Sequence, residues 1–236
     1  MERIILIETS TALCSTALAE NGEITSYRES SAPKAHASLT AVFIEEMLAA
    51  KGLGISDCDA VCVSMGPGSY TGLRVGVSTA KGLCFGSGLP LIAVGTLDTL
   101  VAQALIGSTD QTGDLKYIIP MVDARRMEVY TATFKRNTDG TTFIQTTETA
   151  PAIIDENSFA DLLEEGPCLF IGDGAGKCAD VIKHPNARFQ QCNPMASAML
   201  SPALDAYKEK RFEDVAYFEP FYLKEFVATV SKKKMW

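Results

Sequence analysis

The first stretch of the sequence that could bind a phosphate or hold a metal-bound water is "IETSTALCSTAL" (7–18). Glu8 ends an apolar run there, and the hydroxyl side chains of Thr9, Ser10 and Thr11 follow it directly. A carboxylate at a strand end can hold a metal-bound water, and hydroxyls can donate to a phosphate. The same cluster can also serve only to cap a turn. Both interpretations stay open at this point.

A second candidate is the glycine-rich stretch "GPGSYTG" (66–72), which joins an apolar run to a helical pattern. The spacing of Gly66, Gly68 and Gly72 is one residue longer than the dinucleotide-binding fingerprint, and Pro67 has no N–H to offer a phosphate. The alternative is close packing of the helix that follows. Gly72, Gly76 and Ala80 are spaced i, i+4, i+8 and lie on one face of this helix. This face therefore carries almost no side chain, and a helix of the same domain or of a partner chain could approach it closely.

A third glycine-rich turn, "FIGDGAGKCAD" (170–180), superficially resembles a P-loop. It is one residue short, and Cys178 stands where the hydroxyl that binds Mg²⁺ should be, so we reject that assignment. Gly172 and Gly174, at a helix start, could still contact a nucleotide, although a simple strand-to-helix turn explains them as well.

A polar cluster between two apolar stretches, "MVDARRMEVY" (121–130), has two possible explanations. Asp123, Arg125, Arg126 and Glu128 could form an internal ion-pair network or line a cleft. The chain has only two histidines, and neither stands at a spacing that predicts a metal site or a nucleophile–His–acid set. We therefore name no catalytic residue and no metal ligand.

The elements that must position these stretches follow from hydrophobic patterning and turn signals. Strands are expected at 3–8, 13–20, 23–29, 59–66 and 90–95, and again at 116–125, 127–136, 141–148, 168–172 and 188–192. Helices are expected at 36–52, 70–85, 97–105, 155–166, 175–183 and 195–211, the last broken near Pro202. The order strand, strand, strand, helix, strand, helix thus occurs twice. It predicts two similar α/β subdomains, 1–105 and 106–236, with a cleft between them.

Composition narrows the function classes. The formal net charge of −8 argues against tight, unaided binding to nucleic acid, and the one basic run, Lys232–Lys234, fits a solvated tail. The seven cysteines are scattered through apolar runs, which favours buried thiols in a reducing compartment over disulfides. The N-terminal apolar run is too short for a signal peptide or a membrane span, so we expect a cytoplasmic protein with no membrane contact.

Several of these motifs together resemble those of the TsaB (YeaZ) family. The resemblance spans almost the whole chain, is most specific over 64–83, and rests on "IETSTALCSTAL", "GPGSYTGLRVGVSTAKGL", "PLIAVGTLDTL", "MVDARRMEVY" and "GDGAGK". It implies an actin-like fold, as in sugar kinases and Hsp70-type ATPases, with two related βββαβα subdomains. It also implies a dimerisation subunit of the bacterial machinery that makes threonylcarbamoyladenosine at position 37 of tRNAs.

The resemblance further implies partners and an interface. The catalytic paralogue TsaD carries a His-x-x-x-His metal pair where this chain has Thr96 and Leu100, so a non-catalytic subunit without a cofactor of its own is expected. The expected partners are TsaD, the small ATPase TsaE and, when the chain is alone, a second copy; tRNA would be met only through the complex. The helices at 36–51 and 70–85 should form the interface, with Leu39, Val42, Phe43, Met47, Leu73, Gly76, Val77 and Ala80 in it.

Two alternatives belong to other classes. One is an actin-fold phosphotransferase or hydrolase that binds ATP with Glu8, the 66–72 loop and the 172–176 loop. The other is a glycoprotease-like peptidase, as the older naming of the family suggests. Whether the chain catalyses any reaction by itself is left open. If Gly76 lies in an interface between chains, the change Gly76→Leu should block assembly and leave the monomer folded.

Overall fold

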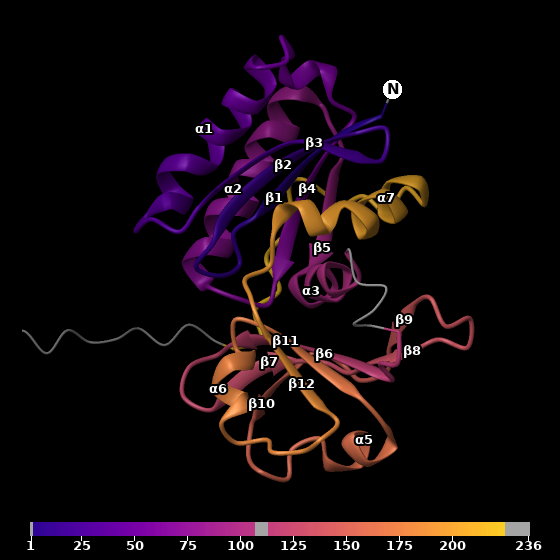
Figure 1. Ribbon diagram of the computed structural model, residues 1–236. Helices are drawn as coiled ribbons and strands as arrows, with labels where there is room; N and C mark the ends of the chain where they lie inside the picture. Colours follow the sequence, from indigo (N-terminus) through magenta and orange to yellow (C-terminus); the bar gives the residue numbers. More distant parts are fainter. Residues whose placement is uncertain (1, 107–112, 225–236) are drawn as a thin grey trace, which may run out of the picture.

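The computed structural model describes residues 2–106 and 113–224, which form two mixed β-sheets one above the other, each flanked by helices (Figure 1). The expected basic run Lys232–Lys234 lies outside the described residues. The first sheet has the order β3-β2-β1-β4-β5. Its strands are β1 (Arg3–Glu8), β2 (Cys14–Glu20), β3 (Glu23–Ser30), β4 (Ala60–Gly66) and β5 (Leu91–Gly95).

Helices cover both faces of the first sheet, which explains why its central strand contains a continuous apolar run between Arg3 and Glu8. Along β1, Ile5 and Ile7 point to the face covered by α1 (Ala35–Ala49) and α2 (Tyr70–Ser87). Ile4 and Leu6 point to the opposite face, where η2 (Ala196–Met199) and α7 (Leu200–Lys208) pack. The alternation is the period of two expected of a strand.

The second sheet repeats the first, with the order β10-β7-β6-β11-β12. In both sheets each of the first three strands of this order is antiparallel to its neighbour among them, and the last two strands run parallel to the central strand. The predicted repeat and the actin-like fold are therefore confirmed. The strands are β6 (Tyr117–Asp123), β7 (Glu128–Thr131), β10 (Ala150–Ile153), β11 (Cys168–Gly172) and β12 (Ala187–Gln191).

The second half differs from the expected elements between residues 127 and 153. The single strand expected at 127–136 is two strands, β7 and β8 (Phe134–Arg136), which pair with different parts of β6. β9 (Phe143–Gln145) pairs only with β8, and the edge strand β10 was not predicted. Its sequence, with a proline and no apolar alternation, carries little strand signal, although proline is acceptable at a sheet edge.

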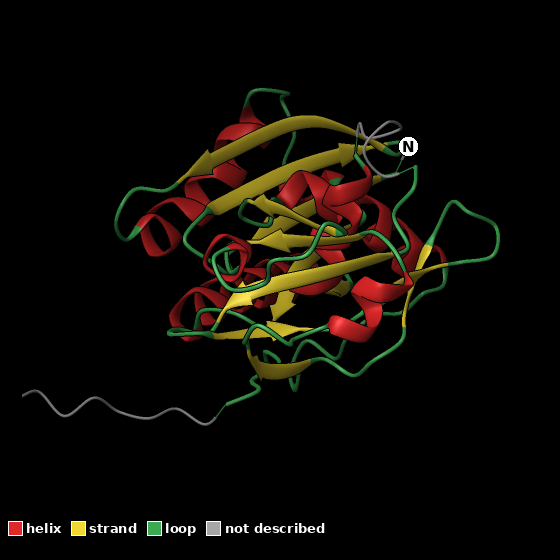
Figure 2. Cartoon of the chain, turned by 60° about the horizontal axis from the view of Figure 1, so that its bottom comes forward, coloured by secondary structure: helices red, strands yellow, loops and turns green. Residues whose placement is uncertain are grey.

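The helices of the second half are shorter than expected. The last helical stretch begins as a 3₁₀ turn, and Pro202 lies in the first turn of α7, where proline is tolerated, so that no break occurs there. Figure 2 shows the helices on either side of the yellow strands. The other bounds are η1 (Ile55–Asp57), α3 (Thr96–Leu105), α5 (Ala160–Glu165) and α6 (Ala175–Ala179). No helix in residues 2–106 and 113–224 is long and apolar enough to cross a bilayer.

The two halves exchange elements, so the expected boundary at residues 105 and 106 does not separate the packing. α3 belongs by sequence to the first half, yet its buried side chains join the core of the second sheet. Conversely, η2 and α7 pack on the first sheet, and the segment after them stays with it: the amide of Glu213 donates to the Leu91 carbonyl (2.8 Å), and that of Phe221 to the Met65 carbonyl (2.7 Å). In Figure 1 the yellow-orange α7 lies beside the upper sheet.

The glycines at the start of α2 let that helix touch the turn after β1. A Cβ added at Gly68 would lie 2.2 Å from the Ser10 carbonyl oxygen, and one at Gly72 would lie 2.1 Å from that of Thr9. A Cβ at Gly76 would lie 2.2 Å from Thr9 Oγ1. Such distances are far below van der Waals contact, so only glycine permits this approach. The glycines therefore serve packing inside the domain.

This packing corrects most of the predicted interface. Five of the eight residues are buried within the chain, so they are not available to a partner; they are Met47, Leu73, Gly76, Val77 and Ala80. The spacing of small residues was recognised correctly, but it faces the chain's own β1–β2 turn.

We expect the glycines of α2 to respond to alanine in opposite ways. Gly72→Ala and Gly76→Ala should each lower the free energy of unfolding by about 1–3 kcal/mol, because the added methyl collides with Thr9. Gly82→Ala is the matched control on the same helix. Its Cβ meets nothing within 4 Å, so it should raise that free energy by about 0.5–1 kcal/mol. Urea unfolding measures all three variants, and equal effects would contradict the packing described.

Candidate functional site

The turn after β1 packs closely against the start of α2. Thr9 and Ser10 are buried, and Thr9 Oγ1 donates to the Gly72 carbonyl (2.9 Å). The amide of Ser69 donates to the Ser10 carbonyl (2.6 Å), which ties the 66–72 loop to this turn. Ser69 itself caps α2, because its hydroxyl accepts from the Gly72 amide (3.3 Å). The hydroxyl and backbone groups considered for a phosphate are thus mostly engaged with one another.

Glu8 is fully buried behind this turn. One carboxylate oxygen accepts from the Ser10 amide (2.7 Å), and the other, Oε2, has no hydrogen-bond partner in the described part of the chain; the same holds for Ser10 Oγ. Burial raises the pKa of the Glu8 carboxyl above its ordinary value, while the hydrogen bond from the Ser10 amide acts in the opposite direction. Beside it, the hydroxyls of Ser64 and Thr96 lie 3.0 Å apart. Glu8 therefore belongs to a cluster of buried polar side chains at the end of β1.

The turn after β11 resembles the turn after β1 in its packing. Gly172 has φ +134°, and a Cβ there would lie 2.2 Å from the Met121 carbonyl oxygen. A Cβ at Gly174 would lie 2.9 Å from Val129 Cγ1. Both glycines bring the backbone close to β6 and β7. This packing agrees with the prediction of a simple strand-to-helix turn. The adjacent Asp173 accepts from the Asp123 amide (2.8 Å), and burial raises the pKa of the Asp173 carboxyl.

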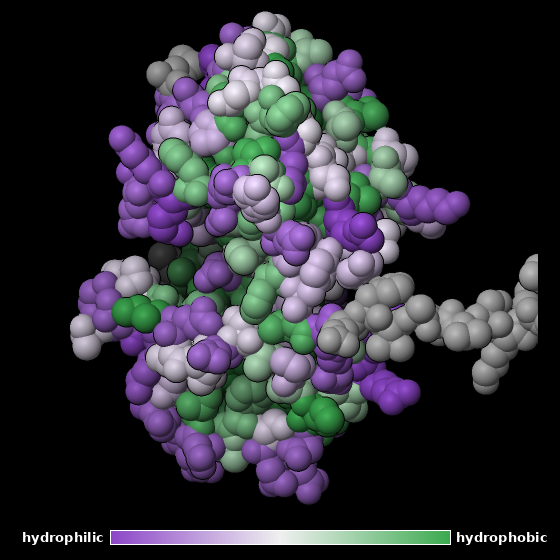
Figure 3. Space-filling view, turned by 180° about the vertical axis from the view of Figure 1, so that it is seen from behind, coloured by the Kyte–Doolittle hydropathy of each residue, from purple (hydrophilic) through white to green (hydrophobic). Residues whose placement is uncertain are grey.

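A cleft of about 740 Å³ separates the two halves, as the repeat predicts. It is lined from the first half by Ser10, Thr11, Ala12, His36 and Pro67–Thr71, and from the second by Val122–Arg125, Tyr130, Asp173 and Phe221–Lys224. The face seen in Figure 3 has mostly pale and green residues across its middle, and purple, hydrophilic residues gather at its edges and lower end. The two glycine-rich turns and the polar cluster at 123–128 thus meet around one cleft.

The structure places part of the 123–128 cluster at the cleft. Asp123 pairs with Lys177, and Glu128 pairs with Lys224, so the carboxylates pair with lysines outside the cluster and not with its arginines. Asp123 and Arg125 also line the cleft. Arg125 and Arg126 have φ of 73° and 49°, a left-handed conformation that is unusual for residues other than glycine, asparagine and aspartate. The amide of Arg125 donates to Asp123 Oδ1 (2.8 Å), which helps to hold this turn.

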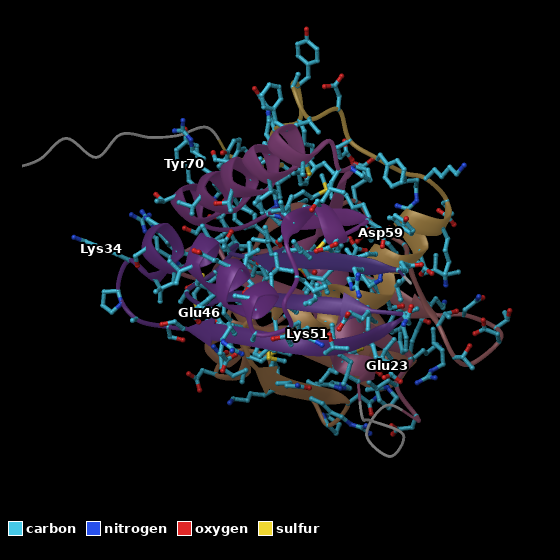
Figure 4. All side chains as sticks on the ribbon, turned by 90° about the horizontal axis from the view of Figure 1, so that it is seen from above. Glu23, Lys34, Glu46, Lys51, Asp59 and Tyr70 are labelled. Carbon is cyan, nitrogen blue, oxygen red and sulfur yellow. The ribbon has the colours of Figure 1, made fainter. Side chains whose placement is uncertain are left out.

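Sequence reasoning assigned the interface to α1 and α2 but, apart from Val42, did not identify the residues on the outer face of this helix pair. The two helices lie side by side, as Figure 4 shows, with Glu46 labelled on α1 and Tyr70 at the start of α2. Phe85 is 87% exposed and Val42 is 40% exposed. A Cβ added at Gly82 or Gly86 would meet no other atom within 4 Å. Further small exposed residues on this face are Ala37, Ala41 and Ser78. Gly76 faces inward. Counted from it at 3.6 residues per turn, Gly82, Phe85 and Gly86 lie on the outward side of α2.

Among residues 2–106 and 113–224, no group of three or more histidine, cysteine, aspartate and glutamate side chains is placed to hold a metal ion. Six of the seven cysteines are buried, and all seven are free thiols.

The raised pKa of Glu8 predicts a pH dependence of stability. A carboxyl whose pKa is higher in the folded than in the unfolded chain stabilises the fold below its ordinary pKa of 4.5, and this contribution is lost as the pH rises through the folded value. Glu8→Gln removes the loss and keeps an acceptor for the Ser10 amide. The variant should therefore gain stability relative to the unmodified chain as the pH rises from about 4.5 to 8. Unfolding curves at several pH values measure this, and a difference that does not change with pH would contradict it.

Comparison with known proteins agrees with the family resemblance seen in the sequence. Residues 28–229 match the family model described as TsaD: tRNA N6-adenosine threonylcarbamoyltransferase. The tRNA threonylcarbamoyladenosine biosynthesis protein TsaB of Escherichia coli strain K12 is 31% identical over 231 residues, which are 96% of this chain and 96% of that protein. TsaB of Haemophilus influenzae is 31% identical over 94% of this chain and 93% of its own length.

The solved structures show the same fold. YeaZ from Pseudomonas aeruginosa superimposes with a TM-score of 0.80 over 94% of this chain and 100% of its own, at 24% sequence identity. Because the family model covers more than half of the chain and a relative 31% identical matches 96% of it, the chain belongs to the TsaB (YeaZ) family of tRNA threonylcarbamoyladenosine biosynthesis proteins.

Proposed function

We propose that this protein is a non-catalytic accessory subunit, which binds and supports a TsaD-like transferase in the threonylcarbamoyladenosine modification of tRNA. The observation that carries the proposal is the outer face of α1 and α2, defined by Ala37, Ala41, Val42, Ser78, Gly82, Phe85 and Gly86, which is exposed yet built from small and apolar residues. An exposed patch of small and apolar residues, flanked on the same two helices by the exposed charged residues Glu45, Glu46 and Arg74, marks a site of protein association.

The chemistry of this face suits a second pair of helices. Gly82 and Gly86 carry no side chain, and nothing lies within 4 Å of a Cβ built on either, so the backbone of another helix can approach α2 closely. Phe85 stands beside them and would supply most of the apolar area buried on association. Leu39, Val42 and Phe43 stay in the proposed interface at the side of α1, because each is at least partly exposed. The partner would thus complete a four-helix contact.

The same face could also pair with a second copy of the chain when the transferase is absent, since a two-fold axis brings identical patches together. TsaE and tRNA would then join through the complex rather than through this chain alone. The whole assembly would work in the cytoplasm, where tRNA is modified. These further partners rest on the family relation.

Size-exclusion chromatography with light scattering tests the interface, on the chain alone and mixed with TsaD of the same organism. We expect a mixed species with the unmodified chain, and its loss with Gly82→Leu, because the added side chain stands where the partner helix should approach. Asp205→Leu is the matched control, since it adds the same side chain on the exposed face of α7, behind the first sheet. Gly76→Leu is unsuitable, because it would disturb the fold itself.

A mixed species that forms equally well with Gly82→Leu and Asp205→Leu would refute this interface. Independent elution of the two unmodified proteins, with ATP and TsaE added, would refute the partner.

Calorimetric titration of the isolated chain with Mg-ATP separates the accessory role from that of an actin-fold phosphotransferase or hydrolase. We expect no binding in the micromolar range, because Gly68 and Gly72 lie against the turn at Thr9 and Ser10, and Glu8 is buried behind that turn. Micromolar affinity would favour the enzyme, with ATP held between the 66–72 and 172–176 loops.

A further inference from the structure

A second pocket, which we call the β7–α5 pocket, lies in the second half of the chain, and nothing in the proposed function uses it. Its volume of about 520 Å³ falls in the range of small-molecule sites. Its lining combines hydroxyl, carboxylate and amide groups with alanine methyls and one aromatic ring. The lining residues are Thr131–Thr133, Thr147, Glu148, Ala150, Ala152, Asn157 and Phe159–Leu162.

The pocket exists because the second sheet splits there. At Ala132 and Thr133 the chain leaves the β6–β7 pairing and enters the β6–β8 pairing, while β9 and β10 continue the two branches separately. Side chains partly replace the missing ladder: the amide of Thr133 donates to Thr147 Oγ1 (2.8 Å). In the first half a two-residue turn joins β2 directly to β3, so that sheet has no corresponding split. The pocket is therefore an addition to the repeated fold.

The charge of the pocket is uncompensated. Glu148 and Asp161 both line it, and no lysine, arginine or histidine does. Within residues 2–106 and 113–224, neither carboxylate makes an ion pair or a hydrogen bond. Other carboxylates around the second sheet are paired, as Glu165 is with Lys116 and Asp114 is with Arg188. The pocket thus presents two negative charges without a counter-charge.

A buried hydroxyl at the pocket wall points to a missing partner. On β7 the pleat turns Thr131 to the same side as Val129, which packs toward α5, so its side chain faces the side on which the pocket lies. Thr131 is 7% exposed, and its Oγ1 has no hydrogen-bond partner in the described part of the chain. A buried polar atom of this kind is costly unless something bonds to it. A donor bound in the pocket would satisfy it.

The remaining wall is suited to a cation on an apolar stem. Phe159, held at φ 64°, contributes an aromatic ring that is fixed edge-on against Phe170 at 5.5 Å between centroids. Aromatic faces attract ammonium groups, and alkyl stems pack on alanine methyls. An ammonium group carries three donors and no acceptor, which matches two carboxylates and one hydroxyl.

We propose that the β7–α5 pocket binds a primary ammonium group carried on an alkyl chain, with Glu148, Asp161 and Thr131 as acceptors and Phe159 and the alanines around the stem. A lysine side chain of a partner and a free alkyl amine offer this same chemistry. The site is independent of the α1–α2 face and of the role proposed for it.

The test follows the alanine methyl signals of the full chain by NMR during titration with two probes, N-acetyl-lysine methylamide and 1,5-diaminopentane. We expect shifts confined to Ala132, Ala150, Ala152 and Ala160, with a dissociation constant on the order of 1 mM. The ε-acetylated lysine derivative is the neutral control and should shift none of them. Shifts with the lysine derivative alone identify a partner's side chain as the source, and shifts with both probes admit free amines too.

Variants decide which groups recognise the probe. Glu148→Gln combined with Asp161→Asn should weaken binding about 10-fold or more, and Thr131→Val should weaken it by a smaller factor. Glu156→Gln removes a charge from the same exposed loop without touching the pocket, and it should leave binding unchanged. Thermal melts confirm that each variant is folded. The proposal is overturned if the four alanines do not shift, if the neutral control shifts them equally, or if the double variant binds as the unmodified chain does.

Discussion

The contact between the start of α2 and the turn after β1 determines the arrangement of the first half and the shape of the cleft. Backbone meets backbone there, with no side chain between Gly68 or Gly72 and the carbonyls of Ser10 and Thr9. Because the approach is so close, the Thr9 hydroxyl donates to the helix and the Ser10 amide donates to Glu8, which is buried behind the turn. A place suited to a phosphate is thereby converted into a packing contact.

The same contact fixes which face of α2 is free. With Gly72, Gly76 and Ala80 turned inward, residues six positions further along the helix are rotated by about 240° and must face away from the sheet. Gly82 and Gly86 are at such positions, with Phe85 beside them. The inward stripe positions the helix, and the outward one leaves its surface open to another chain. One helix therefore carries two glycine stripes with different roles.

Hydrophobic patterning was sufficient to predict the repeated order of strands and helices, because buried central strands such as β1 and β11 contain continuous apolar runs. It could not predict β10, whose edge position needs neither apolar alternation nor free amides. Nor could it predict that α3 and α7 pack on the sheet of the other half, since either sheet offers an apolar face and the sequence does not say which one is nearer.

The direction of the glycine stripe shows why the candidate site was only half predictable. A spacing of four residues states that a helix face is bare, and the neighbour that uses this face must be known separately. Here the neighbour of Gly72 and Gly76 is Thr9 in the chain's own turn, more than sixty positions earlier in the sequence, and Ala80 packs in the core of the first sheet. Gly82 and Gly86, by contrast, have no neighbour within 4 Å. A bare helix face without an intramolecular neighbour is the stronger sign of an interface, because a glycine there lowers helix stability without improving the packing of the monomer.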